Sequence, residues 1–413
     1  MKKRMIPLLF TVLVLVLGGC MGPSEGTTFS RSLLKKPWEE VVKQAKGTDI
    51  RLYMWGGDES INRYIDEWAA PRLKKQYGVK LERVPVSDTQ DIINKLLTEK
   101  QAGKNKGTVD LIWINGENFH TAKEQKLLWG AFADRIPNVK RYVNRETPDI
   151  RLDFGEETQG LEVPWGKAQF VFIYDRNKVK NPPKSMAELK EWVRNHPGKF
   201  TYPAPPDFTG SAFVRQALFE TTGGHKQYVR GMEDERFNRK AEKLWAYLND
   251  LEPYLWREGK TYPESLAKLD QLYANGEVWM TMGYDAARAA GEIRKGRFPE
   301  STRTFVLDQG TLSNTHYLSI PFNAPNPAGA MVATHFLLSP DAQLTKMDPD
   351  HWGEDMALDP ERLSKEDQAR LKNMDRGEAI LPSDKLAKHR IPEVPASVVN
   401  QLEKGWKSHV AKK

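Results

Sequence analysis

Two kinds of hydrophobic spacing alternate along the first third of the chain. Three short runs are rich in β-branched and aromatic residues and are typical of strands: Asp49–Trp55, Val79–Val86 and Val109–Asn115. Between them, apolar residues recur at helical spacing over Glu59–Tyr77, with a kink expected at Pro71, and again between Ser87 and Leu97. This β-α-β-α-β order predicts one half of a doubly wound α/β fold.

The spacing changes at Leu161–Tyr174, a long apolar run interrupted by Pro164-Trp165-Gly166. It suits a strand that passes from one domain to another, and Gly310–Pro321 is the expected return strand. Further strands and helices are expected between and after these two runs: strands at Lys199–Pro203 and Glu277–Gly283, helices after Ser185, at Ser211–Thr221 and at Ala328–Ser339, and a charged helical tail that ends near Trp406.

Chain length and these two crossings together predict the domain organisation. A body of roughly 380 residues exceeds what one hydrophobic core usually supports, so two domains are expected. We expect residues 45–165 and 315–413 to form a discontinuous lobe 1, and residues 166–314 to form lobe 2. The predicted fold class is therefore α/β, with two doubly wound lobes and two interdomain crossings.

The N-terminus has the features of a secretory signal. Lys2, Lys3 and Arg4 precede the apolar run 6–17, which is too short to span a bilayer comfortably. The run ends in Leu17-Gly18-Gly19-Cys20, which resembles the bacterial lipobox, where the cysteine is lipidated after cleavage. We therefore expect a signal peptide at 1–19, and a lipidated Cys20 with a flexible tether over 20–44, since residues 21–30 are rich in Gly, Ser and Thr.

Composition excludes several other classes. Cys20 is the only cysteine in the chain, so disulfides and cysteine-based metal or redox sites are not expected. The formal charge of +7 falls to +4 when the three basic residues of the signal leave. The remaining basic residues are scattered among acids, which does not suit a nucleic-acid partner. No segment after the signal is apolar enough to cross a membrane, so the protein is expected to be extracytoplasmic and held at the cell membrane by its lipid.

Three motifs give the chain a family resemblance. The lipobox, the Tyr-x-Trp-Gly-Gly segment at 53–57 and the run Trp113-Ile-Asn-Gly-Glu-Asn-Phe119 resemble the YnjB-type ABC-transporter substrate-binding proteins. These belong to a superfamily that includes thiamine-, polyamine- and iron-binding receptors. The resemblance covers about residues 45–410. It implies a receptor whose two lobes close over a small ligand and then dock on a membrane permease with its ATPase.

Ligands of open α/β sheets bind beyond the carboxyl ends of the strands. Five loops follow the predicted strands and supply the candidate ligand residues: Trp55, Gly56, Gly57 and Asp58; Asn115, Gly116 and Glu117; Trp165; Tyr202, Asp207, Gly210 and Ser211; Tyr284 and Asp285.

These residues favour an organic cation, which aromatic faces and carboxylates hold by cation–π contact and charge pairing. Several of these residues also have a structural alternative. Asp58, Asn115 and Asp285 could cap helices, and Trp165 could lie in a core. An anion bound by the helix N-terminus at Gly210 and Ser211 is the rival ligand. A metal is a more remote option, because the tyrosines are not clustered.

Enzyme signatures are absent from the sequence. We find no Gly-x-Ser-x-Gly, His-Glu-x-x-His, phosphate-loop or dinucleotide-binding motif, and the histidines are scattered. His316 and His335 are expected to be structural. We therefore expect a receptor without cofactor or resident metal, acting as a monomer, with a surface lipoprotein enzyme as the alternative class.

Overall fold

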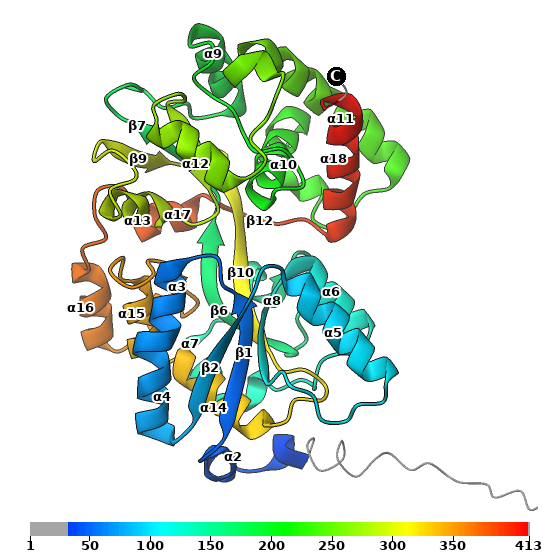
Figure 1. Ribbon diagram of the computed structural model, residues 1–413, viewed down its shortest axis with the longest axis vertical. Coiled ribbons are helices and arrows are strands. Elements are labelled where there is room, and N and C mark those ends of the chain that lie inside the picture. The colour runs from blue at the N-terminus through cyan, green and yellow to red at the C-terminus, as the bar shows by residue number, and fades with distance from the viewer. Residues whose placement is uncertain (1–31, 412–413) are drawn as a thin grey trace, which may run out of the picture.

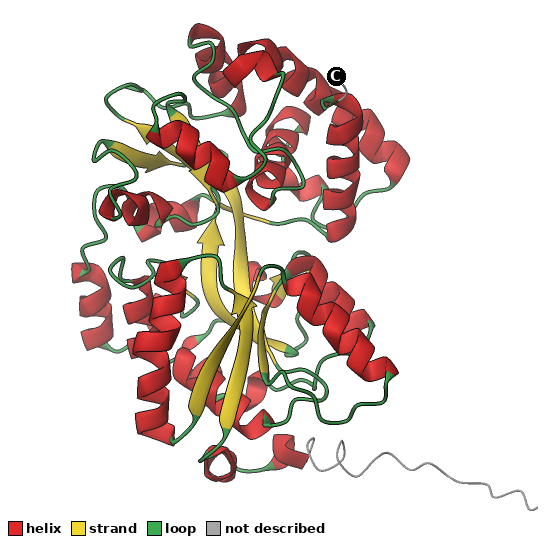
Figure 2. Cartoon of the chain, in the orientation of Figure 1, coloured by secondary structure: helices red, strands yellow, loops and turns green. Residues whose placement is uncertain are grey.

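The computed structural model describes residues 32–411, which form two lobes joined by long paired strands (Figure 1). Lobe 1 contains residues 32–169 and 313–374, and lobe 2 contains residues 170–312 and 379–411, as their separate hydrophobic cores show. Figure 2 shows that helices surround the strands in lobe 1, whereas helices make up most of lobe 2. The family-level prediction of a two-lobe α/β fold is confirmed.

The strands form three sheets. The large sheet runs β11-β6-β10-β3-β1-β2, with β12 pairing beside β10, and the sheet of lobe 2 runs β8-β7-β9. Their bounds are β1 Asp49–Trp55, β2 Lys80–Val86, β3 Leu111–Ile114, β4 Leu152–Asp153, β5 Glu156–Glu157, β6 Glu162–Gln169, β7 Val171–Asp175, β8 Met280–Gly283, β9 Thr302–Phe305, β10 Thr311–Ser319, β11 Asp355–Met356 and β12 Arg390–Pro392.

The helices divide between the lobes. Those of lobe 1 are α2 Trp38–Ala45, α3 Glu59–Arg63, α4 Ala70–Tyr77, α5 Thr89–Gln101, α6 Gly116–Glu124, α7 Pro137–Tyr142, α8 Pro148–Arg151, α14 Pro327–Leu337, α15 Pro340–Met347 and α16 Lys365–Asn373. Those of lobe 2 are α9 Met186–Asn195, α10 Phe208–Thr222, α11 Asp234–Leu251, α12 Leu266–Ala274, α13 Arg288–Arg294, α17 Ser383–Lys388 and α18 Ala396–His409. Short 3₁₀ turns lie at Leu33–Lys35, Ala133–Arg135, His225–Gln227, Glu252–Tyr254, Trp256–Gly259 and Pro360–Arg362, and η2 (Tyr64–Ala69) is π-helical.

In lobe 1, successive side chains of the strands point to opposite faces of the sheet, and helices cover both faces. On β1, Leu52 and Met54 enter the core that α2, α4 and α14 cover, whereas Tyr53 packs on the opposite side with α5 and α6. β3 divides its residues in the same way, because successive side chains of a strand point to opposite faces. β1 pairs in parallel with β2 and β3, as the β-α-β-α-β pattern predicts.

A ribbon of two strands connects the lobes. β6 and β10 pair antiparallel from Ser313–Gln169 to Ser319–Glu162. Their register shifts at Trp165, which has no partner between the pairs His316–Gly166 and Tyr317–Pro164. The break expected at Pro-Trp-Gly is therefore a bulge within a continuous strand, where one extra residue bends the ribbon.

Lobe 2 differs from the doubly wound sheet that we predicted. Both pairings in its sheet, β7 with β8 and β7 with β9, are antiparallel. Lys199–Pro203 is not a strand: it is buried, and it makes only single backbone bonds, such as Trp279 N–H to Lys199 O. The run has the hydrophobicity of a strand because it is buried, although no neighbouring strand pairs along it.

The chain crosses between the lobes a third time, which corrects the predicted boundary. Residues 315–413 were all assigned to lobe 1, but residues 379–410 pack in the core of lobe 2. Trp406 of α18 donates from Nε1 to the hydroxyl of Tyr202, 3.0 Å away and 204 residues earlier in the chain. The prediction was wrong because local helical spacing does not specify which lobe a helix packs against.

The predicted tether also ends earlier than expected. Signal residues 1–19 and Cys20 lie outside the described residues, but 33–44, assigned to the tether, are structured. Val41 and Ala45 of α2 are fully covered, and Trp38 packs edge-on against His335 of α14 at 5.0 Å. A helix that buries this much apolar surface is part of lobe 1 rather than a linker.

We expect Leu402→Ala in α18 to lower the free energy of unfolding by about 2–5 kcal/mol, because Leu402 is fully buried in the core of lobe 2. Urea denaturation measures the change. Lys404→Ala, on the exposed side of the same helix, should stay within about 0.5 kcal/mol of the native protein. Equal losses in the two variants would contradict the packing of α18 on lobe 2.

Candidate functional site

The lobes approach each other on both sides of the connecting ribbon (Figure 1). On the side of α3 and α13, Lys295 lies 3.9 Å from Asp58, and Arg294 lies 3.5 Å from Asp350. On the other side, Gly155 of the β4–β5 turn lies against Pro395, which precedes α18. The carboxyl ends of β1 and β3 therefore lie on the side of lobe 1 that faces lobe 2, and we call the region between the lobes at these strand ends the cleft.

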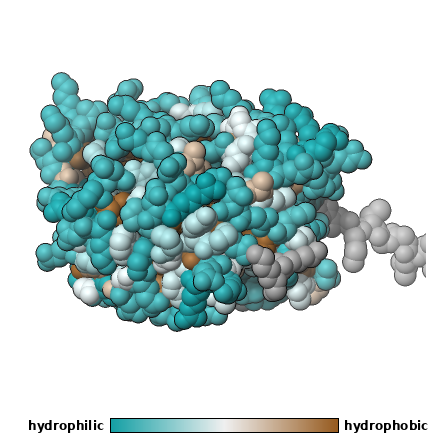
Figure 3. Space-filling model, turned by 90° about the horizontal axis from the view of Figure 1, so that it is seen from above, coloured by the Kyte–Doolittle hydropathy of each residue, from teal (hydrophilic) through white to brown (hydrophobic). Residues whose placement is uncertain are grey.

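Two exposed aromatic side chains lie at this cleft, one from each lobe. Among residues 32–411, the large apolar side chains with high exposure are Trp55 at 42% and Phe208 at 50%. Trp55 ends β1 and covers Gly57, where a side chain would collide with the indole. Phe208 begins α10 and packs on Tyr284 with ring centroids 5.0 Å apart. By contrast, the outer surface of lobe 2 is largely hydrophilic (Figure 3).

Carboxylates gather beside the aromatics. Asp58 caps α3 by accepting from the backbone N–H groups of Ser60 and Ile61, at 2.7 and 3.2 Å. Asp285 accepts from Ala287 N–H at 2.9 Å. Burial raises the pKa of Asp285 to about 6, and the nearby charges of Glu354 and Asp58 add to the rise. Burial is the main cause of this rise, and the charge of Arg288 only partly offsets it.

Glu354 forms a compensated group at the base of the cleft. Its carboxylate lies 2.6 Å from Lys346 Nζ and 2.5 Å from His316 Nδ1. Although burial alone would raise the pKa of Glu354, these two neighbours lower it to about 2. Gly166 of β6 has no room for a side chain because a Cβ would collide with Glu354 and Lys346. The hinge glycine is thus required by the close approach of a buried ion pair.

Three tryptophans pack around this group. Trp165 lies 5.2 Å from both Trp113 and Trp352, between ring centroids, and the three belong to one hydrophobic core. Trp165 is fully buried, so the structure places it behind the cleft wall and not on its surface. Its carbonyl oxygen accepts from Gln343 and Lys346. The structure therefore favours a core role for Trp165 over a role in binding the ligand.

A buried acid, Asp153, accepts a backbone hydrogen bond from the loop after β3. Gly116 has a φ of +60°, a conformation that glycine adopts without strain, and its N–H donates to Asp153 Oδ2 at 2.7 Å. Burial raises the pKa of Asp153 well above its ordinary range. The side chain of Asn115 makes no capping bond, and Glu117 is exposed. This leaves Asn115 and Glu117 available to a ligand.

The loop before α10 contributes less than we predicted. Tyr202 is fully buried in the core of lobe 2, with its ring stacked on Phe213. Asp207 Oδ1 accepts from Thr209 and Gly210 N–H, and Asp207 Oδ2 accepts from Leu266 N–H. Gly210 packs against the carbonyl of Pro203, and Ser211 is almost fully buried. The helix N-terminus nominated for an anion is thus already capped by a carboxylate.

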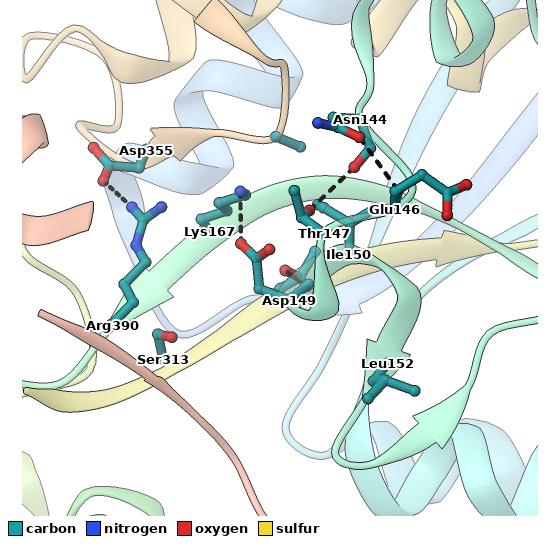
Figure 4. Close-up of polar contacts among 12 residues, drawn as sticks. Asn144, Glu146, Thr147, Asp149, Ile150, Leu152, Lys167, Ser313, Asp355 and Arg390 are labelled. Carbon is teal, nitrogen blue, oxygen red and sulfur yellow. Dashed lines mark hydrogen bonds and ion pairs between the residues drawn. The ribbon is translucent and has the colours of Figure 1, made fainter. Parts of the chain in front are cut away.

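A separate polar cluster lies on the connecting ribbon. Lys167 of β6 pairs with Asp149 at 2.7 Å, and Arg390 of β12 pairs with Asp355 at 2.5 Å (Figure 4). Arg376 also pairs with Asp355, at 2.8 Å. Burial opposes ionisation of Asp149, but Lys167 holds its pKa below the ordinary value. Lys167 thus compensates Asp149, two arginines compensate Asp355, and these contacts hold the ribbon to its neighbouring segments.

Of the nominated residues, the structure brings Trp55, Asp58, Tyr284 and Asp285 to the cleft, with Gly56, Gly57 and the loop 115–117 beside them. It does not bring Tyr202, Asp207, Gly210, Ser211 or Trp165 to the surface of the cleft. Phe208 lies within the nominated loop from Asp207 to Ser211 and is exposed there. The residues that our list missed are Arg215, His316, Glu354 and Glu393. Phe208 had a local signal, as an aromatic residue just after the nominated Asp207, whereas Glu354 and Glu393 come from a part of the chain with no such signal.

The structure contains no cluster of three His, Cys, Asp or Glu side chains in residues 32–411 that could hold a metal ion. Within the same range, no helix is long and apolar enough to cross a membrane. A cavity of about 480 Å³ lies at α9, outside the cleft, and is lined in part by Trp192, His196 and Glu191.

Comparison with known proteins identifies the family. The model of the bacterial extracellular solute-binding proteins matches residues 68–351, more than half of the chain. The chain belongs to this family. It is the solute-binding component of an ABC transporter, which binds a small ligand and works with a membrane permease. The cleft between the lobes is where such a ligand is expected to bind.

Individual relatives agree with this assignment. The chain is 40% identical over 379 residues to Protein YnjB of Escherichia coli K12, covering 92% of this chain and 95% of that relative. It is 27% identical over 133 residues to the thiamine-binding periplasmic protein of Salmonella typhimurium, covering 31% of this chain and 36% of that protein. The spermidine/putrescine-binding protein PotD of Streptococcus pneumoniae has the same fold, with a TM-score of 0.63, 14% identity and coverage of 88% and 99%.

We expect Asp285→Asn to increase stability near neutral pH. The folded-state pKa of Asp285 is raised from 3.8 to about 6, so the native protein loses stability as the pH rises through 6. The neutral amide keeps the acceptor for Ala287 N–H and avoids this loss. The variant should be more stable than the native protein by up to about 3 kcal/mol at pH 7.5, with no difference below pH 4.

Urea denaturation between pH 4 and 7.5 measures this difference. Asp384→Asn is the matched control, because Asp384 is an exposed aspartate of lobe 2 and its substitution changes the net charge equally. A difference that does not depend on pH, or one that is equal in the two variants, would show that the pKa of Asp285 is not raised in the folded protein.

Proposed function

We propose that this solute-binding protein captures a small organic cation in the cleft between its lobes. The observation that carries the proposal is the exposure of Trp55 and Phe208, one from each lobe, near the carboxylates Asp58 and Asp285. Apolar side chains of this size are normally covered, and exposed ones mark binding surfaces. An aromatic face also attracts a cation through its quadrupole.

The electrostatics supports a cation over an anion. Asp58 and Asp285 together supply two negative charges, whereas the nearest exposed base, Lys295, lies 3.9 Å from Asp58. The N-terminus of α10, which could have received an anion, donates its first N–H groups to Asp207 instead. An anion would therefore meet acids on both sides of the cleft, while a cation would relieve their mutual repulsion.

The names of the relatives are consistent with this chemistry. Thiamine, spermidine and putrescine, named for a partial relative and for a structural neighbour, are organic cations. We propose binding without turnover, because the family to which the chain belongs consists of solute-binding proteins. We propose further that Cys20 is lipidated, and that the protein acts as a monomer delivering its ligand to a permease at the outer face of the cell membrane.

We expect Trp55→Ala and Phe208→Ala each to raise the Kd of a bound cation about 5- to 30-fold, since a desolvated cation–π contact contributes roughly 1–2 kcal/mol. Titration calorimetry with thiamine, spermidine and inorganic phosphate makes the measurement. Trp192→Ala is the matched control, because Trp192 lines the cavity at α9. Binding of phosphate alone, or a loss confined to Trp192→Ala, would place the ligand chemistry or its site elsewhere.

Replacing the lipobox cysteine should release the protein from the membrane. Acyl chains on Cys20 would contribute about 0.8 kcal/mol for each buried CH₂ group, enough for stable anchoring with more than one chain. We expect the full-length native chain to fractionate with membranes until detergent is added, and Cys20→Ala to remain in the aqueous fraction. A Cys20→Ala protein that still fractionates with membranes would mean that another segment holds it there.

A further inference from the structure

A buried ion pair lies next to Phe208 and Tyr284, the two packed aromatic rings that we call the aromatic wall of lobe 2. Arg215 of α10 is 1% exposed, and Glu393, which follows β12 in lobe 2, is 3% exposed. Arg215 Nη2 donates to Glu393 Oε1 at 3.0 Å, and Arg215 Nε lies 3.0 Å from Glu393 Oε2. Arg215 Nη1 donates to the hydroxyl of Ser211 at 2.8 Å. The planar guanidinium is therefore held on two edges, which leaves it little freedom.

The same pair contacts the residues that face the ligand cleft. The hydroxyl of Tyr284 donates to Glu393 Oε1 at 2.6 Å. The guanidinium of Arg215 lies 5.9 Å from the ring of Phe208, and Phe208 packs on Tyr284. Both aromatic rings of the wall are thus in contact with the ion pair or with each other.

Glu393 also lies close to the opposite wall of the cleft. Its charge contributes to the raised pKa of Asp153, although burial is the main cause. Asp153 in turn accepts from the N–H of Gly116, in the loop after β3. Pro395, two residues after Glu393 and directly before α18, lies against Gly155 of lobe 1, so the segment that carries Glu393 reaches the other lobe.

We propose that the Arg215–Glu393 ion pair positions the Phe208–Tyr284 wall, so that Glu393 determines ligand affinity without touching the ligand. This inference rests on the proposed cleft function. A buried ion pair is no more stabilising than an apolar pair of the same volume, so stability alone does not account for it. Its geometry does: a fixed acceptor at Glu393 directs the hydroxyl of Tyr284 away from the cleft and presents the ring beside Phe208.

Two measurements on the full chain test the proposal, one with and one without ligand. The first is ¹⁹F NMR with 4-fluorophenylalanine at position 208, in the native protein, Glu393→Gln, Tyr284→Phe and Glu378→Gln. Glu378→Gln is the matched control, since Glu378 also pairs with an arginine of lobe 2, Arg303, but is 76% exposed. The second is the Kd of thiamine and of spermidine, measured well below the melting temperature so that lost stability does not affect it.

We expect Glu393→Gln to shift or broaden the position-208 resonance and to raise the Kd of the bound cation at least ten-fold. Tyr284→Phe should act in the same direction with a smaller effect, and Glu378→Gln should match the native protein in both. A position-208 resonance that is unchanged in Glu393→Gln would overturn the proposal. If Glu393→Gln does not fold, an unchanged resonance and an unchanged Kd in Tyr284→Phe would overturn it instead.

The Kd measurement and the ¹⁹F measurement test the two proposals independently. If neither thiamine nor spermidine binds the native protein, the cation proposal fails, while the resonance at position 208 still decides whether Glu393 positions the wall. If a cation binds and its Kd is the same in Glu393→Gln, the wall is held by other contacts and the inference is wrong even though the cleft function stands.

Discussion

The antiparallel pairing of β6 with β10 is the constraint on which the rest of the molecule depends. These strands belong to the sheet of lobe 1, yet their far ends lead directly into lobe 2 through Phe170 and Leu312. Because the backbone groups along the ribbon are paired, bending is concentrated where the pairing is irregular, at the bulge of Trp165. After the third crossing, the chain joins the ribbon again, where β12 pairs with residues 311–313. Any movement of the lobes must therefore carry the C-terminal segment with it.

Charges at the boundary between the lobes fall into two groups with different consequences. On the ribbon, Asp149 and Asp355 each have a basic partner within 2.8 Å, so their charge is compensated inside the protein. In the cleft, burial raises the pKa of Asp285, and the charges of two further acids, Glu354 and Asp58, add to the rise. A paired acid holds structure together, while an acid in excess negative charge is available to a cationic ligand. The difference depends on neighbours from distant parts of the chain.

Much of the fold follows from local pattern. β1 was expected at Asp49–Trp55 and is found there, because a buried strand between two turn signals has few alternatives. The expected kink at Pro71 corresponds to the π-helical turn at 64–69 just before it. The errors share a different origin. Lys199–Pro203 looked like a strand because it is apolar, and α18 was given to the wrong lobe because its stripe fits either core. Which strands pair and which lobe a helix packs against depend on contacts distant in sequence, and local hydrophobic spacing does not specify them.

The candidate site shows the same division. The sequence alone predicted an export signal with a lipobox cysteine, two α/β lobes, and ligand residues that follow the ends of the strands, and the two lobes are confirmed. Only the tertiary structure decided which of those residues face the cleft. Tyr202 and Phe208 are aromatic and six residues apart, yet Tyr202 is fully buried beneath Trp406 while Phe208 is half exposed. Exposure depends on what packs over a side chain, and here that neighbour comes from the far end of the sequence.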